Sequence, residues 1–341
     1  MSQESPGLSW RAACLYGLAV LAIPALIGQG QLTKRAFNEE PVHRLERDRP
    51  EGVLLGDSML QTRIDAPKLS KLAHARWDAL GYAGSGTAHW YLVFKNIVAV
   101  QPTLPGAVII LYRDRQLTLP QYHVDGRNRP RLEALMHTSE SVVESHIEST
   151  AEGQTDLLEH WAHRLYPLES HRLEWQDKLQ RLALQLACPK QNPDTVTDAA
   201  AREFDVRHLR ADAGPFAEGE ETASNPLDPP GHSFAASVDH SFLPLLLDLA
   251  KQKNIRLIFY RVKHKPSRDG SPVRESPELQ TYQIDLADYL HKAGITLIDE
   301  TQDAAVDLTY YGGDDHVRES MMTPYTEVFW RHVQSAVTSS H

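Results

Sequence analysis

The sequence predicts an α/β fold, a three-layer α/β/α sandwich with a parallel sheet, which a helical insertion interrupts and an N-terminal membrane segment precedes. Short apolar runs alternate with amphipathic segments, the pattern of repeated strand–helix–strand units. The chain has 341 residues, of which 41% are hydrophobic and 23% are charged. This composition is typical of a globular protein, and the length allows one large domain with insertions or two small ones.

Five short apolar runs predict the strands of the sheet: residues 52–56, 77–80, 106–112, 256–262 and 295–298. The third run, GAVIILY, is the clearest because Pro105 and Gly106 mark its beginning. The helices are predicted from five amphipathic stretches: residues 59–73, 87–100, 242–251, 278–291 and 323–337. Five strands with helices between them favour a flavodoxin-like, doubly wound sheet.

An apolar segment near the N-terminus predicts contact with a membrane. Residues 12–28, AACLYGLAVLAIPALIG, form an uncharged run of 17 residues between Arg11 and the pair Lys34–Arg35. A membrane-spanning helix needs about 20 residues, and the apolar part of a signal peptide has about 7–15. We expect residues 1–30 to be an uncleaved signal anchor, with a cleaved signal and a buried core helix as the alternatives. If the N-terminus stays in the cytoplasm of a bacterium, the rest of the chain lies on the periplasmic side of the inner membrane.

Residues 119–239 are too long for an ordinary connection and predict an insertion. Their first part, residues 131–186, has a helical pattern, and their second part, residues 189–231, is rich in Pro, Asp, Glu and Ala. We expect a helical cap followed by a mobile loop. The insertion divides the α/β domain into residues 31–118 and residues 240–341.

Charge and composition argue against several kinds of partner. The net charge is -10 and no stretch gathers the cluster of Lys and Arg that a phosphate backbone would demand, so no nucleic acid partner is expected. Two cysteines cannot build a thiolate metal site, and we interpret Glu159, His160 and His163 as a solvated helix face rather than a zinc site. No metal or cofactor is expected. The basic run at residues 261–265, RVKHK, is interpreted as a solvated strand end, with a polyanion or lipid site as the alternative.

A candidate nucleophile follows the first predicted strand, where the chain reads Gly56-Asp57-Ser58. A strand-to-helix turn at this point places the serine hydroxyl at the carboxyl edge of the sheet, near a helix N-terminus. Ligand sites of α/β proteins form at this edge. The alternative is an ordinary helix cap, because Asp and Ser both cap helices well.

A candidate base lies near the other end of the chain, in Gly313-Asp314-Asp315-His316. A serine needs a base to take its proton, and a histidine base works best when a carboxylate fixes its tautomer. The loops after the first and last strands lie at the same edge of a parallel sheet, so we expect Ser58 and His316 to meet. Since the chain has 17 histidines, a chance Asp-His pair is the alternative.

Together, the two ends of the chain resemble the GDSL/SGNH hydrolase superfamily, from about Gly52 onward and excluding the insertion. The resemblance implies that Ser58 is the nucleophile, that His316 is the base and that an aspartate orients the base. It also implies an oxyanion hole built from the amide of Ser58 and a glycine after the second strand. Gly86, in Ser-Gly-Thr, fits that glycine best and Gly84 is the alternative, while a plain turn is the simpler explanation of both.

Two positions depart from the family pattern. Arg113 stands where the family has an oxyanion asparagine, and a guanidinium suits an oxyanion or an anionic substrate group. The family places its aspartate three residues before the histidine, and that position is Gly313 here. Asp314 has the Asp-x-His spacing of alginate-type acetylation proteins, and Asp315 is the alternative orienting carboxylate.

The anchor, the altered third block and the insertion resemble the branch of SGNH-like proteins that accompanies O-acetylation of cell-surface polysaccharides and D-alanylation of teichoic acid. That resemblance implies a serine esterase or O-acyltransferase that acts on acyl esters, in particular acetyl esters, of a polysaccharide beside a membrane-bound O-acyltransferase. Water as the acceptor makes an esterase and a sugar hydroxyl makes a transferase, and the sequence leaves both open. The competing hypotheses are a non-catalytic accessory protein that binds a polysaccharide or a membrane O-acyltransferase, and an unrelated α/β protein with a chance Gly-Asp-Ser.

Overall fold

The computed structural model describes residues 37–124, 128–137, 140–151, 225–312 and 315–338. Its centre is a sheet of five parallel strands in the order β2-β1-β3-β4-β5. The strands are β1 (Gly52–Gly56), β2 (Trp77–Gly81), β3 (Ala107–Tyr112), β4 (Arg256–Arg261) and β5 (Thr296–Asp299). The predicted doubly wound sheet is confirmed, and no strand bound differs from its prediction by more than one residue.

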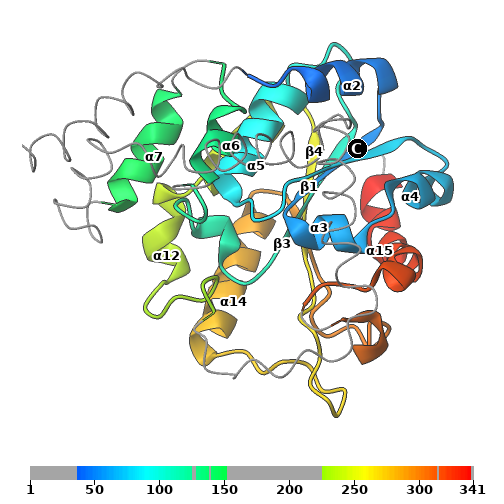
Figure 1. Ribbon diagram of the computed structural model, residues 1–341. Coiled ribbons are helices and arrows are strands. Elements are labelled where there is room, and N and C mark those ends of the chain that lie inside the picture. Colours follow the sequence, from blue (N-terminus) through cyan, green and yellow to red (C-terminus); the bar gives the residue numbers. More distant parts are fainter. Residues whose placement is uncertain (1–36, 125–127, 138–139, 152–224, 313–314, 339–341) are drawn as a thin grey trace, which may run out of the picture.

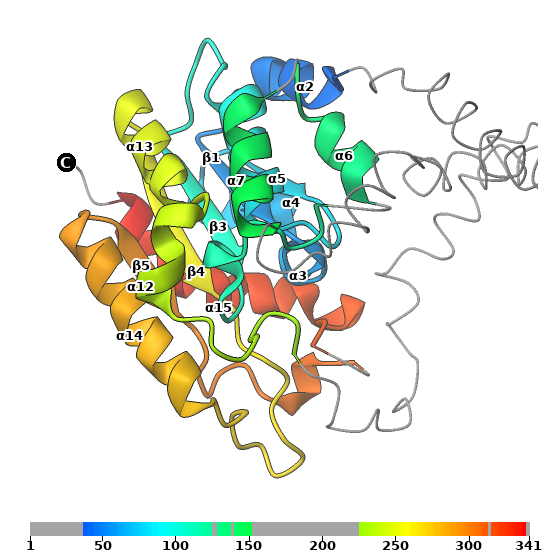
Figure 2. The same ribbon diagram turned by 90° about the vertical axis from the view of Figure 1, so that its left-hand side faces the viewer.

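Helices cover both faces of the sheet (Figure 1). One face carries α5 (Thr87–Val93), α6 (Arg129–Glu133), α7 (Ser141–Ala151), α12 (Phe234–Ser237), α13 (Leu243–Lys253) and α14 (Pro277–Lys292). The other carries α3 (Ser58–Arg63), α4 (Ala66–Ala73) and α15 (Glu319–Thr338). Figure 2 views the molecule from the first face, with α12, α13 and α14 in front of the strands. The three layers of the prediction are therefore present.

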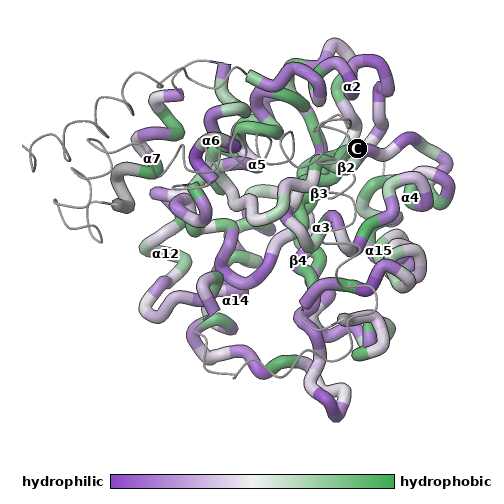
Figure 3. The backbone as a smooth tube through the Cα atoms, viewed as in Figure 1, coloured by the Kyte–Doolittle hydropathy of each residue, from purple (hydrophilic) through white to green (hydrophobic). Residues whose placement is uncertain are grey.

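The strands alternate between two hydrophobic cores. Val53 and Leu55 of β1 belong to the core under α5 and α14, whereas Leu54 belongs to the core under α3 and α15. Every residue of β1 and β3 is buried, which explains the continuous apolar runs in the sequence. The same apolar strands form the green centre of the tube in Figure 3. A rigid sheet of this kind fixes the positions of the loops at its carboxyl edge.

The predicted helix at residues 59–73 is two helices, which corrects the sequence analysis. The first, α3, ends at Arg63, and α4 begins at Ala66 with Pro67 in its first turn. Asp65 caps α4 by accepting a hydrogen bond from the amide of Lys68 at 3.0 Å. The break follows because the proline lacks an amide and suits only the first turn of a helix.

Two further helices differ from the expectation. The predicted helix at residues 87–100 continues beyond α5 as a π-helical turn, η1 (Phe94–Val98). The sequence analysis omitted α2 (Glu40–Asp48), which is polar except for a few residues and packs Leu45 into the first core. Most of its residues are charged, so it contains no run of apolar residues that would mark it in the sequence.

The predicted membrane segment at residues 12–28 and most of the predicted insertion lie outside the described residues. Of the insertion, the structure describes α6, α7, α12 and the segments next to them. Glu159, His160 and His163 also lie outside the described ranges. Within those ranges, no helix combines the length and the hydropathy that a membrane span requires.

Candidate active site

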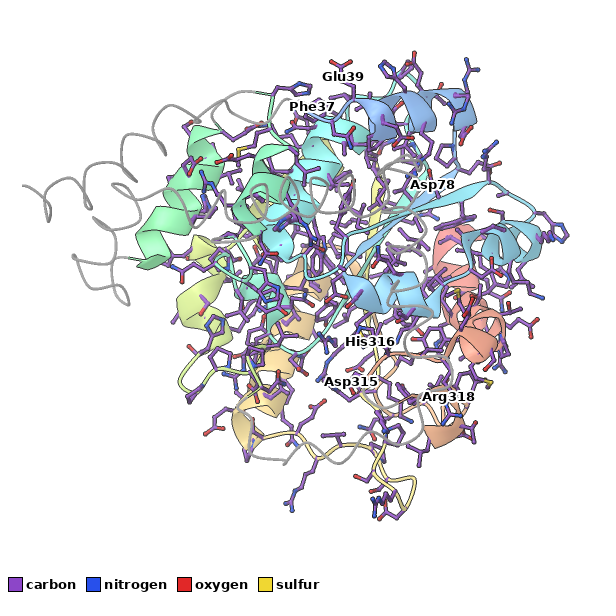
Figure 4. All side chains as sticks on the ribbon, viewed as in Figure 1. Phe37, Glu39, Asp78, Asp315, His316 and Arg318 are labelled. Carbon is purple, nitrogen blue, oxygen red and sulfur yellow. The ribbon has the colours of Figure 1, made fainter. Side chains whose placement is uncertain are left out.

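The two predicted reactive side chains meet at the carboxyl edge of the sheet. Ser58 is the first residue of α3, directly after β1, and His316 lies in the loop between β5 and α15. Although 258 residues separate them, His316 Nε2 lies 2.9 Å from Ser58 Oγ. His316 is 9% exposed and Ser58 is half-buried, so the contact is sheltered but reachable. Figure 4 shows where His316 and its neighbour Asp315 lie, next to α3.

Asp57 caps the helix that carries the serine. Its side chain accepts a hydrogen bond from the amide of Met59 at 2.8 Å. The helix-cap alternative is thus correct for Asp57, while the neighbouring Ser58 contacts a histidine. As the first residue of α3, Ser58 has an amide with no carbonyl one turn earlier in the helix to bind. The turn therefore offers both a hydroxyl and an amide donor at the same point.

Of the two carboxylates predicted to orient His316, the structure describes Asp315 but not Asp314. Asp315 Oδ1 accepts a hydrogen bond from the amide of Lys265 at 2.8 Å, and Asp315 Oδ2 lies 2.8 Å from His264 Nδ1. Both oxygens of Asp315 are thus engaged by groups other than the ring of His316. Asp314 lies outside the described residues and stays the predicted orienting carboxylate.

His264 bridges two carboxylates from different loops. Its Nε2 lies 2.9 Å from Asp114 Oδ1, in the loop after β3, and its Nδ1 faces Asp315. Both ring nitrogens must carry protons to donate to both partners. Burial alone favours the neutral ring, but the hydrogen bonds to Asp114 and Asp315 and their charges raise the pKa of His264 to about 9. His264 is therefore an imidazolium at neutral pH.

This arrangement corrects the interpretation of residues 261–265 as a solvated strand end. Arg261 and Lys263 are only 2% and 4% exposed, and the ammonium of Lys263 donates to the carbonyl of Asp303 at 2.7 Å. Arg261 and Lys263 are buried because parallel strands end at the same edge of the sheet, where several loops converge. The apolar run of β4 gives no sign that the polar residues after it are buried as well.

The predicted glycine block is held beside the nucleophile turn. Ser85 Oγ donates to the carbonyl of Gly56 at 3.1 Å. Gly84 has a φ of +72°, the left-handed region that glycine adopts at little cost. Gly86 precedes α5, and a Cβ there would lie 2.9 Å from the carbonyl oxygen of Tyr122. Local structure thus explains why both residues are glycines: Gly84 has a left-handed turn conformation, and the backbone of Tyr122 approaches Gly86 closely.

Arg113 lies between the carboxylates that adjoin the reactive pair in sequence. Its Nη2 is 3.8 Å from Asp57 Oδ2, and its Nη1 is 3.4 Å from Asp315 Oδ2. The side chain is only 16% exposed. The structure therefore places a half-buried cation between the neighbours of Ser58 and His316, at the position where the resemblance expects an asparagine.

Sequence reasoning missed two more residues of this edge. Gln116 is fully buried, and its amide nitrogen donates to Asp57 Oδ2 at 3.2 Å and to the carbonyl of Ser85 at 3.1 Å. Tyr122 covers Gly86, and burial raises the pKa of its phenol despite the opposing charge of Arg113. The signal for Gln116 was available, since it is the amide side chain that follows Arg113 in the same loop. No pattern in the sequence marks Tyr122.

Comparisons with known proteins add little to this geometry. No family model and no curated protein matches the sequence. A proposed acylhydrolase from Bacteroides fragilis NCTC 9343 is similar in structure, with a TM-score of 0.37 and 10% identity over 91% of this chain and 93% of that one. A GDSL-like lipase from Bacteroides thetaiotaomicron VPI-5482 has a TM-score of 0.36 and 10% identity over 84% and 86% of the two chains. Because these scores and identities are low, the function has to be argued from the site itself.

Proposed function

We propose that the chain is a serine esterase or O-acyltransferase of the SGNH/GDSL type. The observation that carries the proposal is the 2.9 Å contact between Ser58 Oγ and His316 Nε2. A serine at a helix N-terminus with a buried imidazole at hydrogen-bond distance is the arrangement of a nucleophile and its base. A chance Asp-His pair would not bring the ring to the one serine that the first motif singled out.

In the proposed mechanism, Ser58 Oγ attacks the carbonyl carbon of an ester while His316 Nε2 takes the hydroxyl proton. The tetrahedral intermediate collapses, and His316 gives that proton to the departing alcohol. An acceptor hydroxyl, from water or from a sugar, then attacks the acyl carbon while His316 takes its proton. The second intermediate collapses, the bond to Ser58 Oγ breaks, and His316 returns the proton to Ser58 Oγ. The amides of Ser58 and Gly86 and the cation of Arg113 stabilise the oxyanion, and Asp314 orients the base. This sequence of steps needs no metal or cofactor.

The more specific part of the proposal concerns the substrate, the partner protein and the cellular location. The sequence resemblance supports acyl esters, in particular acetyl esters, of a cell-surface polysaccharide as substrates. It also supports a membrane-bound O-acyltransferase as partner and an extracytoplasmic site tethered by residues 1–30. The acceptor separates the esterase from the transferase.

The test is a covalent label and a simple ester. Full-length protein is treated with a serine-directed fluorophosphonate and assayed with p-nitrophenyl acetate, beside Ser58→Ala and His316→Ala. Both variants should lose labelling, and kcat should fall by roughly 10⁴-fold or more. Matched controls are Ser145→Ala and His43→Ala, whose side chains are exposed.

Labelling that persists in Ser58→Ala would overturn the proposed nucleophile. A folded wild-type protein that is neither labelled nor active would favour the accessory role. One observation favours that second candidate, since the guanidinium of Arg113 replaces the family asparagine and is already paired with Asp57 and Asp315.

A further inference from the structure

The basic run at residues 261–265 has no part in the proposed mechanism, yet it lies against the segment that carries the base. Lys265 follows β4, and His316 lies between β5 and α15. The strands β4 and β5 are parallel neighbours in the sheet, so the segments that follow them meet at its carboxyl edge. A contact from one segment to the other can therefore determine where the base lies.

The segment that carries His316 is paired with itself. Tyr311 and Val317 form an isolated antiparallel bridge. Next to this bridge, the amide of Gly312 donates a hydrogen bond to the carbonyl of His316 at 3.2 Å. Because these two backbones are bonded directly, a shift of Gly312 also shifts His316.

Lys265 holds this paired segment from outside. Its ammonium donates a hydrogen bond to the carbonyl of Gly312 at 2.9 Å, and its backbone amide donates to Asp315 Oδ1 at 2.8 Å. Gly312 belongs to the first half of the paired segment, and Asp315, directly before His316, belongs to the second half. One residue after β4 thus contacts both halves.

The position of Lys265 is itself restricted. Lys265 is half-buried, and Pro266 after it is buried. A residue before a proline favours extended backbone conformations, so the backbone of Lys265 has little freedom. A hydrogen bond from an ammonium to a carbonyl is charge-assisted, which makes it stronger than a bond between two neutral groups. Lys265 therefore has the restricted backbone and the strong contact that are needed to fix another segment in place.

The reaction is sensitive to such a contact because the base has to stay close to the nucleophile. His316 Nε2 lies 2.9 Å from Ser58 Oγ. A misplacement of about 1 Å can lower a rate about 10²-fold. Gly312 is bonded to His316 through its amide and to Lys265 through its carbonyl, so it connects the ammonium to the base.

We propose that Lys265 is a positioning residue of the reaction: its ammonium holds the carbonyl of Gly312 and thereby keeps His316 Nε2 within hydrogen-bond distance of Ser58 Oγ. This inference rests on the proposed function, because His316 has to be the base. It also gives the basic run a role in the reaction.

The first test removes the ammonium. In full-length Lys265→Met, kcat for p-nitrophenyl acetate should fall about 10–100-fold while KM stays within about twofold of the wild-type value, because the ester still binds at Ser58. The rate of labelling by the fluorophosphonate should fall by a similar factor, since labelling also needs the base. The matched control is Lys68→Met, which removes a half-buried ammonium that is paired with Glu327 of α15, and it should leave both rates unchanged.

The second test restores the ammonium chemically. Lys265→Cys should lose as much kcat as Lys265→Met. The thiolate of the new cysteine displaces bromide from 2-bromoethylamine, and the C–S bond that forms gives a side chain with the length and charge of lysine. After this treatment kcat should rise at least about tenfold toward the wild-type value, because the contact with Gly312 is restored. Wild-type protein treated in the same way controls for Cys14 and Cys188.

The outcomes separate this inference from the proposed function. With Ser58→Ala inactive, the positioning role is overturned by an unchanged kcat in Lys265→Met, by a rise in KM alone, or by a kcat that stays low after complete modification of Lys265→Cys. If circular dichroism shows that both Lys265 variants are unfolded, the ammonium serves stability alone and the positioning role is overturned as well. Activity that persists in Ser58→Ala would overturn the proposed function itself.

Discussion

Several carboxylates lie near the reactive pair in the fold or in the sequence, and those that the structure describes have different partners. Asp57 caps α3, Asp114 and Asp315 hold His264, and Asp314 is the remaining acidic residue beside His316 in sequence. The contacts described for Asp57, Asp114 and Asp315 are with groups other than the ring of His316. Asp314 therefore stays the predicted orienting carboxylate, with Asp315 as the alternative.

We expect Asp314→Asn and Asp315→Asn to fail in different ways. Asp314→Asn should lower kcat by about 10⁴-fold, because an amide stabilises the wrong tautomer of a catalytic histidine. Asp315→Asn should instead lower the free energy of unfolding by about 1–3 kcal/mol, since it weakens charge-assisted contacts with His264 and Lys265. Ester turnover and urea unfolding of both variants check the assignment. The reverse pattern would make Asp315 the orienting residue.

The protonation of His264 should make the stability of the fold depend on pH. The ordinary pKa of histidine is about 6.5 and that of folded His264 is about 9, so the protonated bridge stabilises the fold fully below about pH 6.5. The contribution is lost as pH rises through about 9. Arg113 and Arg261 also face the bridging carboxylates.

We therefore expect esterase activity to fall reversibly as pH rises through about 9. In His264→Gln, which has no titrating ring, activity should be lower at neutral pH and this alkaline fall should disappear. Circular dichroism across the same range shows whether the variant stays folded. An unchanged alkaline limb in His264→Gln would assign the titration to another group.

At the scale of elements, the turn after each strand determines which side chains lie at the carboxyl edge of the sheet. The first helix on the α3 side stops after a few residues, and α4 begins at a new cap on Asp65. The same Asp65 donates its own amide to Thr326 of α15 at 2.9 Å. The break thus turns α4 so that it can pack beside α15.

Removing this cap should destabilise the fold without touching the chemistry. Asp65→Ala should cost about 1 kcal/mol, the usual loss at an N-cap, whereas Asp65→Asn should retain most of the stability. Urea unfolding measures the difference, and kcat with p-nitrophenyl acetate should stay at the wild-type value in both variants. Equal stability of Asp65→Ala and the wild type would show that Pro67 alone sets the beginning of α4.

At the scale of the whole molecule, a buried arginine joins distant segments beneath the site. Arg63, at the end of α3, is fully buried and donates to the carbonyl of Lys263 at 2.8 Å. Its guanidinium lies 5.7 Å from the ring centre of Tyr311 and 5.5 Å from that of Tyr325. Tyr325 donates to the buried carboxylate of Glu300 at 2.5 Å. These contacts tie α3, the loop after β4 and α15 together.

Arg63→Met should lower the free energy of unfolding by about 3–5 kcal/mol, because it removes a buried positive charge that favours the ionised form of the buried Glu300 and a hydrogen bond to the carbonyl of Lys263. The double variant Arg63→Met/Glu300→Gln should recover part of the loss. The free energies of unfolding of the single and double variants are measured by denaturant unfolding. A single variant as stable as the wild type would mean that Glu300 folds in its neutral form.

The sequence by itself determined the sheet and the reactive pair. The runs of buried residues in β1 and β3 and the turn signals before Gly106 are local, so they can be recognised without knowing the rest of the fold. The pairing of Ser58 with His316 was also predictable, because all parallel strands end at one edge and only a few reactive residues follow them. The break of the helix at Asp65 had a local signal in Pro67 that the periodicity of residues 59–73 outweighed.

The tertiary structure alone decided what surrounds that pair. His264 contacts Asp114 across 150 residues of sequence, and Gln116 contacts Asp57 across 59. Periodicity records which face of an element is buried, but it carries no record of which loops converge at the end of a sheet. Each of these contacts depends on the register and twist of several strands at once. For that reason the bridge that His264 forms between Asp114 and Asp315 appeared only in the folded chain.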